Sequence, residues 1–389
     1  MIIDCHCHVF TNSCTPFLGM VKNRFKELLY GSAFESQDKD NIGFILKHPL
    51  NYLTAIKTSR QPMATIVQQL LETSGADICV PLTMNFEHGY MSSKPATSFI
   101  QQRDEMIQLT LAAQGRIMPF FAYDPRSDLT KEDPIHSARQ AIETQGFVGI
   151  KLYPPLGYSP CNNPDQKINN ALNLLYTFCC FDAKGTPRPS PIPITTHCSW
   201  CAGSYSNVPV PGVWNKKKYY RKLANPHYWE EVLKDFPMLK LNLAHFGGLG
   251  EWQARTKNKQ PNQQWIDLIC DLIANHENVY TDLSFIGLPT SNMADAYHRL
   301  LLDKIQNIED KILMGSDWYI SLAQCSLPDY WHGYRKMLSP RHFSMWTESN
   351  ALSFLQSDAS RNFFPAFFKT HRSHITSNYL IPFQERTIH

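Results

Sequence analysis

Short hydrophobic runs alternate with longer amphipathic stretches along almost the whole chain. The short runs are rich in β-branched and aromatic residues and end at polar residues, a pattern typical of buried strands. Eight strands are predicted on this basis: Met1–Cys5, Ile78–Leu82, Arg116–Ala122, Phe147–Leu152, Ile192–Thr196, Leu239–Ala244, Val279–Leu283 and Ile312–Gly315. The amphipathic stretches predict helices between them: Met63–Thr73, Phe99–Ala113, Pro134–Thr144, Asp165–Cys180, Pro226–Lys234, Gln263–Asn275 and Met293–Ile308.

Regular alternation of strand and helix indicates parallel βα units. Eight such units in 389 residues predict one α/β domain over 1–389, a (β/α)8 TIM barrel. A doubly wound sheet is the competing fold, but it usually carries a glycine-rich turn after its first strand, where this chain has His6 and His8. The extra length falls in loop insertions after strands one and five, 9–61 and 198–225, and in a C-terminal tail, 359–389. Since both insertions follow strands that end in histidines, we expect them to cover a pocket.

Composition and charge exclude several other classes of protein. With 37 Lys and Arg against 34 Asp and Glu, the formal charge is only +3. The one dense basic cluster, at 216–222, contains tyrosines, so we expect a solvated loop there and no nucleic-acid partner. No apolar run approaches the ~20 residues that span a bilayer, and no leader pattern precedes the first strand, so we expect a cytoplasmic protein without membrane contact. The prevalence of two-fold symmetric assemblies favours a homodimer.

The cysteines also agree with the expected cytoplasmic location. Eleven cysteines in a chain without a secretion signal favour reduced thiols over a disulfide framework. Cys198 and Cys201 have the C-x-x-C spacing of redox and zinc sites, but no second such pair accompanies them. We therefore expect incidental thiols near a site.

Two histidines with one residue between them directly follow the first predicted strand. Side chains alternate along a strand, so His6 and His8 project from the same face, as does Asp4. A shared metal ion explains this spacing, but hydrogen bonds to backbone carbonyls or water would satisfy two histidines equally well. The pair alone leaves both explanations open.

Other predicted strands also end in residues that bind or support metals. The carboxyl ends of all strands of a barrel meet at one mouth, so residues distant in sequence can form one site. Each residue alone has an ordinary explanation, such as a loop cap or a lysine that reaches solvent. Together they predict a metal centre for a small-molecule substrate. Its six members are His6, His8, Lys151, His197, His245 and Asp317.

This ordered set resembles the amidohydrolase superfamily, in which a His-x-His pair on strand one, histidines on strands five and six and an aspartate on strand eight surround the metal. Four phrases resemble the branch that contains aminocarboxymuconate-semialdehyde decarboxylase: Pro119–Arg126, His245–Gly248, Gly315–Trp318 and Asn350–Leu352. The segment Lys151–Pro154 is similar instead to strand four of dihydroorotases, where a carboxylated lysine bridges two metals. The chain combines features of both groups.

The resemblance implies one of two metal arrangements. With two ions, His6, His8, Asp317 and carboxylated Lys151 hold one, and Lys151, His197 and His245 hold the other. With one ion, the ligands are His6, His8, His197 and Asp317, and His245 becomes catalytic. A divalent cation would repel an ammonium on Lys151, so only a carbamate or a neutral amine fits beside it. We favour two ions and expect Zn²⁺ first, with manganese, iron or nickel as alternatives.

The implied function is metal-dependent hydrolysis, in which activated water attacks an amide, lactone or related bond of a small, carboxylated or ring-bearing substrate. Asp317 would orient the water, accept its proton and pass it to the leaving group, and His245 is the other predicted catalytic residue. The alternative is non-oxidative decarboxylation, in which His245 and Asp317 manage a proton. A barrel that binds metal and ligand without turnover is a third hypothesis.

Four further residues are predicted to contact the substrate: Arg126, Tyr153, Trp200 and Trp318. Arg126 follows strand three and would pair with a substrate carboxylate. The aromatic residues crowd the predicted mouth, where their rings suit a flat ligand. Aromatic side chains near strand ends also commonly pack loops, so both roles stay open for them.

Overall fold

The computed structural model describes residues 1–16, 49–89, 94–200, 216–256, 264–286, 294–323 and 325–357. All eight predicted strands are present there in the predicted order. They are β1 (Ile3–Cys7), β2 (Ile78–Pro81), β3 (Phe120–Ala122), β4 (Gly149–Leu152), β5 (Ile194–Ser199), β6 (Leu241–Gly247), β7 (Val279–Asp282) and β8 (Ile312–Leu313). Every pairing between these strands is parallel.

The strands follow one another around a barrel in sequence order. β3 to β8 form a six-stranded sheet, and β1 pairs with β2 in a separate two-stranded sheet. At both seams between the sheets the ladder is reduced to isolated parallel bridges. Across the β8–β1 seam, Cys5 N donates to Met314 O at 2.9 Å and Asp317 N donates to His6 O at 2.7 Å. The predicted TIM barrel is confirmed, although its ladder is not continuous around the ring.

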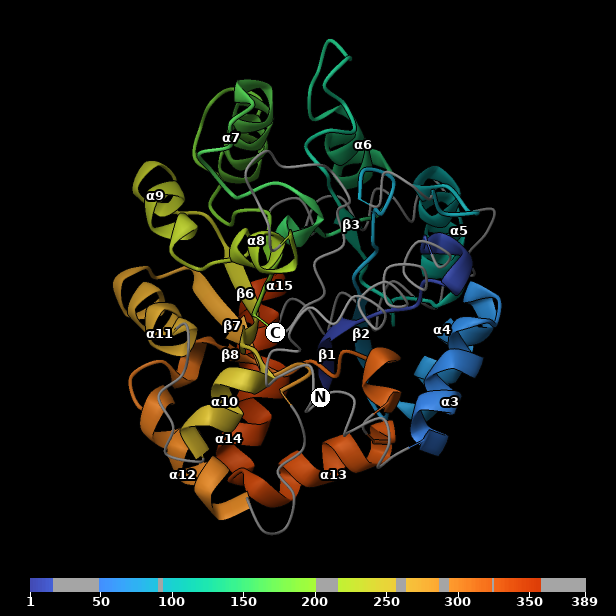
Figure 1. Ribbon diagram of the computed structural model, residues 1–389, viewed down its shortest axis with the longest axis vertical. Helices are drawn as coiled ribbons and strands as arrows, with labels where there is room; N and C mark the ends of the chain where they lie inside the picture. Colours follow the sequence, from blue (N-terminus) through green and yellow to red (C-terminus); the bar gives the residue numbers. More distant parts are fainter. Residues whose placement is uncertain are drawn as a thin grey trace.

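Helices surround the strands and follow one another around the ring (Figure 1). All seven predicted helices are present: α4 (Met63–Thr73), α5 (Phe99–Ala112), α6 (His136–Thr144), α7 (Gln166–Cys180), α9 (Tyr228–Asp235), α11 (Trp265–Asn275) and α12 (Ala294–Ile305). Side-chain caps explain the starts of two of them. Ser98 and Gln101 form a capping box at α5, and the Asp165 carboxylate caps α7.

The remaining helices lie outside the seven predicted ranges. They are α3 (Pro49–Ser59), α8 (Lys216–Lys222), α10 (Leu249–Thr256), α13 (Leu327–Met337), α14 (Pro340–Ser344) and α15 (Asn350–Leu355), with short 3-10 turns and a π-helical turn, η5 (Met345–Ser349), that joins α14 to α15.

Three strands, β1, β5 and β6, run beyond their predicted ends. They take in His6, His197 and His245, which the prediction placed just after the strands. A parallel ladder pairs backbone groups whatever side chains they carry, and His197 pairs with Ala244 in this way. His6, His197 and His245 therefore lie on strands, and His8 follows the last residue of β1.

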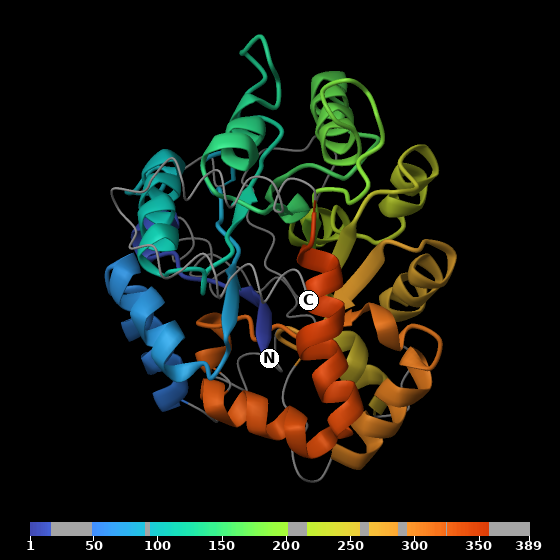
Figure 2. The ribbon, with the colours of Figure 1, turned by 180° about the vertical axis from the view of Figure 1, so that it is seen from behind.

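The C-terminal helical run, which consists of α14, η5 and α15, covers the amino ends of the strands. This is the end of the barrel opposite the predicted mouth. In Figure 2 this run, coloured red, lies across the middle of the barrel. The amino group of Met1 pairs with Glu348 at 2.8 Å, and the Tyr280 hydroxyl hydrogen-bonds Ser353 Oγ at 3.1 Å. Ala351, Phe354 and Leu355 join a buried cluster with strand residues that include Ile3, Ile78, Val80, Phe120 and Leu313.

The two predicted insertions lie partly outside the described residues. Within 9–61 the structure shows α3, and within 198–225 it shows α8, so each contains a helix where only loop was expected. The basic cluster at 216–222 forms α8. Cys201 and the predicted tail, 359–389, lie outside the described residues.

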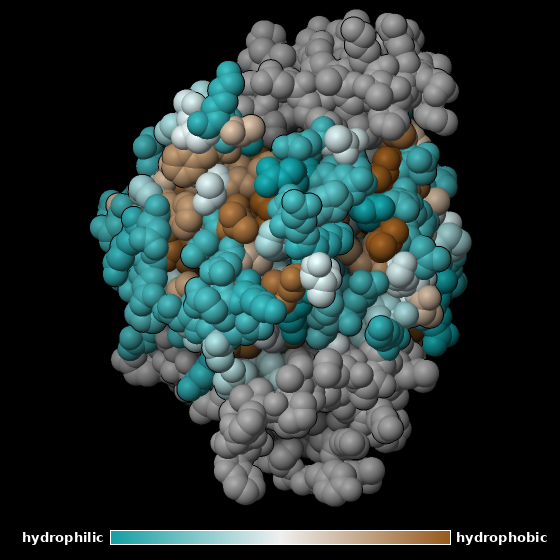
Figure 3. Space-filling model, turned by 90° about the horizontal axis from the view of Figure 1, so that it is seen from above, coloured by the Kyte–Doolittle hydropathy of each residue, from teal (hydrophilic) through white to brown (hydrophobic). Residues whose placement is uncertain are grey.

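No helix in the described part of the chain is both long and apolar enough to cross a bilayer. The face shown in Figure 3 is mainly hydrophilic, with hydrophobic side chains in small separate groups, as is usual for a folded surface.

Candidate metal centre

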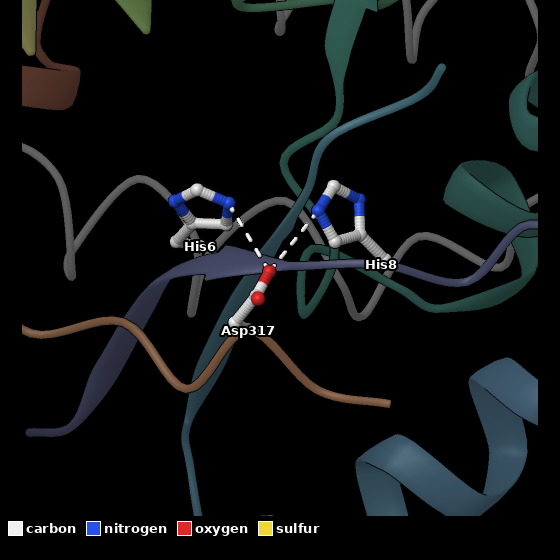
Figure 4. A group of neighbouring side chains, drawn as sticks. All are labelled: His6, His8 and Asp317. Carbon is white, nitrogen blue, oxygen red and sulfur yellow. Dashed lines mark ion pairs between the residues drawn. The ribbon is translucent and has the colours of Figure 1, made fainter. Parts of the chain in front are cut away.

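His6, His8 and Asp317 converge on one point at the β8–β1 seam (Figure 4). His6 lies on β1, His8 directly follows that strand, and Asp317 follows β8. Asp317 Oδ1 lies 3.4 Å from His6 Nε2 and 3.2 Å from His8 Nε2. All three residues are buried. Their ligand atoms are close enough together to hold one metal ion.

The other ring nitrogens of these histidines are anchored on acceptors. His8 Nδ1 lies 2.9 Å from Leu82 O, which can only accept, so Nδ1 carries the hydrogen. His6 Nδ1 lies 3.0 Å from Asp282 Oδ2 and likewise donates. Each Nε2 of a neutral ring therefore presents a lone pair to Asp317 Oδ1. Three lone pairs at this separation repel one another unless a cation lies between them.

His197, His245 and Lys151 lie beside this group. The ring centroid of His245 is 4.7 Å from those of His6 and His197. His245 Nδ1 lies 3.1 Å from Ser284 O, so this ring too carries its hydrogen on Nδ1. Lys151 is buried on β4, where the carboxylates of Asp282 and Asp317 favour the charged form of its amine. All six predicted site residues are thus brought together at the carboxyl ends of the strands.

Several buried atoms of this cluster have no hydrogen-bond partner among the described residues: His6 Nε2, Lys151 Nζ, His197 Nε2 and Asp317 Oδ1. Leaving a buried polar atom unpaired costs about 1–3 kcal/mol. Imidazole nitrogens and a carboxylate oxygen are ligands that divalent first-row metals accept. The cluster therefore fits a divalent metal, because the acceptors beside His6, His8 and His245 occupy only the Nδ1 atom of each ring.

The backbone at the two predicted catalytic residues is left-handed. The φ angle is 70° at His245 and 53° at Asp317. This region is uncommon for residues other than glycine and recurs at functional sites, where the surrounding structure enforces it. Next to Asp317, a Cβ on Gly315 would lie 2.5 Å from His6 Cβ, so only glycine lets the two segments approach this closely.

Asp4 ties the same two segments together. Its Oδ1 accepts from Ser316 N at 2.9 Å and from His6 N at 3.3 Å, and its Oδ2 accepts from Ser316 Oγ at 2.5 Å. Burial raises the pKa of Asp4 to about 7, against the opposing hydrogen bonds from Ser316. Asp4 thus holds His6 and Asp317 in register, a role that the sequence analysis did not assign.

Asp282 and Ser284 were also missed. Asp282 ends β7 and is fully buried between His6 and His245. Ser284 Oγ donates to Asp282 Oδ1 and lies 2.8 Å from His245 Nδ1. A signal was present in the sequence, since Asp282 is an acidic residue one position before the end of the seventh predicted strand, Val279–Leu283.

Burial sets the protonation states at the centre. It lowers the pKa of His6 to about 3 and that of His197 well below the usual value, so both rings are neutral near pH 7. It also lowers the pKa of Lys151 to about 8, against Asp282 and Asp317. Burial opposes ionisation of Asp282, but His6 and His245 outweigh it and its pKa lies well below the usual range. The net pKa of Asp317 is lowered in the same way, against burial, by His8 and His6.

The four residues predicted to contact substrate lie in different surroundings. Arg126 is paired with buried Asp124, through Nε at 2.8 Å and Nη2 at 2.6 Å, and donates to Leu156 O at 3.2 Å. The Tyr153 ring lies 4.7 Å from that of His197. Trp200 and Trp318 are almost fully buried. Tyr153 is therefore the aromatic residue of this set with both partial exposure and contact with the metal-site histidines.

Comparison with solved structures identifies the fold. The chain is similar to 5-carboxyvanillate decarboxylase from Novosphingobium aromaticivorans complexed with manganese (TM-score 0.52, 13% identity, covering 91% of this chain and 96% of that one). It is similar to an uncharacterised TIM-barrel protein from Bordetella bronchiseptica (TM-score 0.51, 15% identity, covering 91% of this chain and 98% of that one). It also resembles an amidohydrolase from Burkholderia multivorans with bound zinc (TM-score 0.50, 12% identity, covering 91% of this chain and 99% of that one). At these identities the likeness shows the barrel fold.

Sequence comparison goes further. No curated protein matches the chain significantly. The family described as amidohydrolase matches residues 3–356, a span that runs from the first residue of β1 to just beyond α15. This span contains all six residues of the candidate metal centre, in the order that the resemblance required. The chain therefore belongs to the amidohydrolase family.

Proposed function

We propose that this protein is a metal-dependent hydrolase that cleaves an amide, lactone or related bond of a small, carboxylated or ring-bearing substrate. The observation that carries the proposal is the convergence of His6 Nε2 and His8 Nε2 on Asp317 Oδ1, at 3.4 and 3.2 Å, in a buried site. When bound, a divalent ion supplies a Lewis acid that makes hydroxide available near neutral pH.

The protein's own residues would then manage the proton and exclude water. Asp317 is ionised and lies at the edge of the cluster, so its carboxylate can hold a water, take a proton from it and return that proton to the leaving group. His245, fixed through Nδ1, presents Nε2 to the same space. The buried rings around them keep bulk solvent away from the reacting bond.

Lys151 decides the number of ions. Its Nζ is buried, has no hydrogen-bond partner among the described residues and faces the same cluster. Reaction of the neutral amine with carbon dioxide forms a carbamate and releases one proton. The carbamate would provide the anionic ligand that a second ion, held also by His197 and His245, needs.

Metal content and intact mass test this proposal together. The purified full chain is dialysed with Zn²⁺ in the presence or absence of bicarbonate, then assayed for metal per chain and for a carbon dioxide adduct that acid removes. Two ions with an adduct support the two-ion site, and the Lys151→Met variant should then lose both the adduct and the second ion. One ion without an adduct would refute carboxylation of Lys151. No ion would refute the metal-dependent function.

Decarboxylation is the second candidate, and one observation favours it. As an ammonium, Lys151 is attracted by Asp282 and Asp317, and a buried cation would suit a substrate carboxylate better than a second metal. Turnover in ¹⁸O-labelled water separates the two reactions. Hydrolysis places the label in the product, whereas decarboxylation releases carbon dioxide and leaves the product free of the label.

A further inference from the structure

A hydrogen-bonded pair behind the candidate metal centre, Asp282 and Ser284, contacts two of its histidines at once. Asp282 ends β7, and Ser284 follows two residues later. Both side chains are fully buried. Because residues on one strand end reach both β1 and β6, their hydrogen bonds can fix two rings relative to each other.

The Asp282 carboxylate is surrounded by donors. Oδ2 accepts from His6 Nδ1 at 3.0 Å and from Asn242 Nδ2 at 2.8 Å. Oδ1 accepts from His245 N at 3.0 Å, from Ser284 N at 3.1 Å and from Ser284 Oγ. His6, His245 and Asp282 also lie close enough together to resemble a metal-binding group. With its oxygens occupied by these donors, the carboxylate has no free lone pair for an ion, in contrast to Asp317 Oδ1.

Ser284 forms similar hydrogen bonds to His245. Its hydroxyl hydrogen is given to Asp282, so Oγ can only accept from its other neighbours, His245 Nδ1 at 2.8 Å and His6 Nδ1 at 3.1 Å. The carbonyl of Ser284 accepts from His245 Nδ1 as well, at 3.1 Å. Every contact at the two Nδ1 atoms is therefore with an acceptor.

We propose that Asp282 and Ser284 are positioning residues that hold His6 and His245 in the tautomer with hydrogen on Nδ1, so that both Nε2 lone pairs face the metal centre. A ring in the other tautomer would point an N–H group at the ion and could not bind it. The affinity part of this inference rests on the proposed function, whereas the tautomer part does not.

The test compares Asp282→Asn with Asp128→Asn in the full chain. Asp128 is the control, since it too is a buried carboxylate that accepts from a serine amide and hydroxyl, those of Ser137, but its other partner is Lys131 and it has no hydrogen bond or ion pair with a histidine among the described residues. Long-range ¹H–¹⁵N spectra of ¹⁵N-histidine-labelled, metal-free protein report the tautomer of each ring. Competition with a chromogenic chelator gives the dissociation constant for Zn²⁺.

The wild-type chain and Asp128→Asn should show the Nδ1–H tautomer at His6 and His245 and bind Zn²⁺ equally. Asp282→Asn should lose that tautomer at His6 and weaken Zn²⁺ binding roughly 10–100-fold. Unchanged tautomers with unchanged affinity would overturn the proposal. If the wild type shows the tautomers but binds no Zn²⁺, the proposed function fails and the positioning role stands.

A second variant covers the case in which Asp282→Asn does not fold. Ser284→Ala removes the shared hydroxyl but keeps the Ser284 carbonyl and Asp282, so we expect a smaller loss of Zn²⁺ affinity, with His245 more affected than His6. Ser137→Ala is its control. Ser284→Ala that matches the control in both tautomers and affinity would overturn the role of this pair.

Discussion

Asp124 and Arg126 form an ion pair next to β3 in which the side chains are only 2% and 16% exposed. Two hydrogen bonds join guanidinium and carboxylate, and Arg126 N also donates to Asp124 Oδ1 at 3.0 Å. Burial opposes the charge on Asp124, but Arg126 outweighs it, so the pKa of Asp124 is lowered. Arg126 is therefore first of all a structural partner, and any substrate carboxylate would have to share it with Asp124.

The stability of the pair should depend on pH. Because the folded-state pKa of Asp124 lies below its ordinary value of about 3.9, the pair stabilises the fold fully above that value and loses its effect as the pH falls through the folded-state pKa. Asp124→Asn should cost about 3 kcal/mol at pH 7, as expected for breaking a buried pair, and progressively less below about pH 4. Urea unfolding of both proteins from pH 7 to pH 3 measures the difference.

Asp310→Asn is the control for this measurement. Asp310 is 66% exposed and lies 3.4 Å from Lys311, so its loss should change the free energy of unfolding by less than about 1 kcal/mol. A difference between wild type and Asp124→Asn that stayed constant down to pH 3 would show that ionisation of Asp124 is not the source of the stability.

At the scale of elements, a buried lysine contributes to the contact between the start of β6 and the end of α15. Lys240 precedes β6 and is only 5% exposed. Its Nζ donates to Gln356 O at 2.6 Å, to Ser353 O at 2.9 Å and to Ser190 Oγ at 3.1 Å. Carbonyls at a helix C-terminus lack partners within the helix and carry partial negative charge, so a buried cation is well placed there.

Replacement of this lysine should loosen the C-terminal helix. Lys240→Met keeps most of the side-chain volume but removes the donors, and we expect a loss of about 2–3 kcal/mol in the free energy of unfolding. Lys234→Met, in the exposed last turn of α9, is the matched control and should have little effect. Urea unfolding of the two variants measures this, and equal free energies of unfolding would contradict the role of Lys240.

At the scale of the whole molecule, the candidate metal centre lies across the β8–β1 seam. His6 and His8 stand on one side of the seam and Asp317 on the other, where the strand ladder is reduced to an isolated bridge. An ion that binds all three would link the two-stranded and six-stranded sheets. Metal binding should therefore stabilise the barrel as well as create the site.

Metal removal tests this link. At a free Zn²⁺ concentration 100 times the dissociation constant, binding to the folded state adds about 2.7 kcal/mol, so chelation should lower the melting temperature of the wild type. His8→Asn should lose most of this response. His342→Asn, which removes a histidine that pairs with Glu309 outside the centre, should keep it. A melting temperature that changes with neither Zn²⁺ nor chelator would contradict a metal at the seam.

Much of the fold was predictable because local patterns of hydrophobic and polar residues indicate its strands and helices. Buried strands and amphipathic helices have different hydrophobic periods, so their order and approximate bounds follow from short windows of sequence. The limits of β1, β5 and β6 were not predictable, since His6, His197 and His245 look like loop residues but remain in the parallel ladder. The helices α3 and α8 were missed, since both insertions were predicted as loops.

The sequence by itself determined the barrel, the family and the six polar residues at the strand ends, because strand order and the carboxyl-end rule bring those residues to one mouth. Only the tertiary structure decided how they are held. The bond from His6 to Asp282 joins residues 276 positions apart, and the bonds from Asp4 to Ser316 span 312. Contacts of this kind depend on the packing of distant strands, so no local pattern in the chain records them.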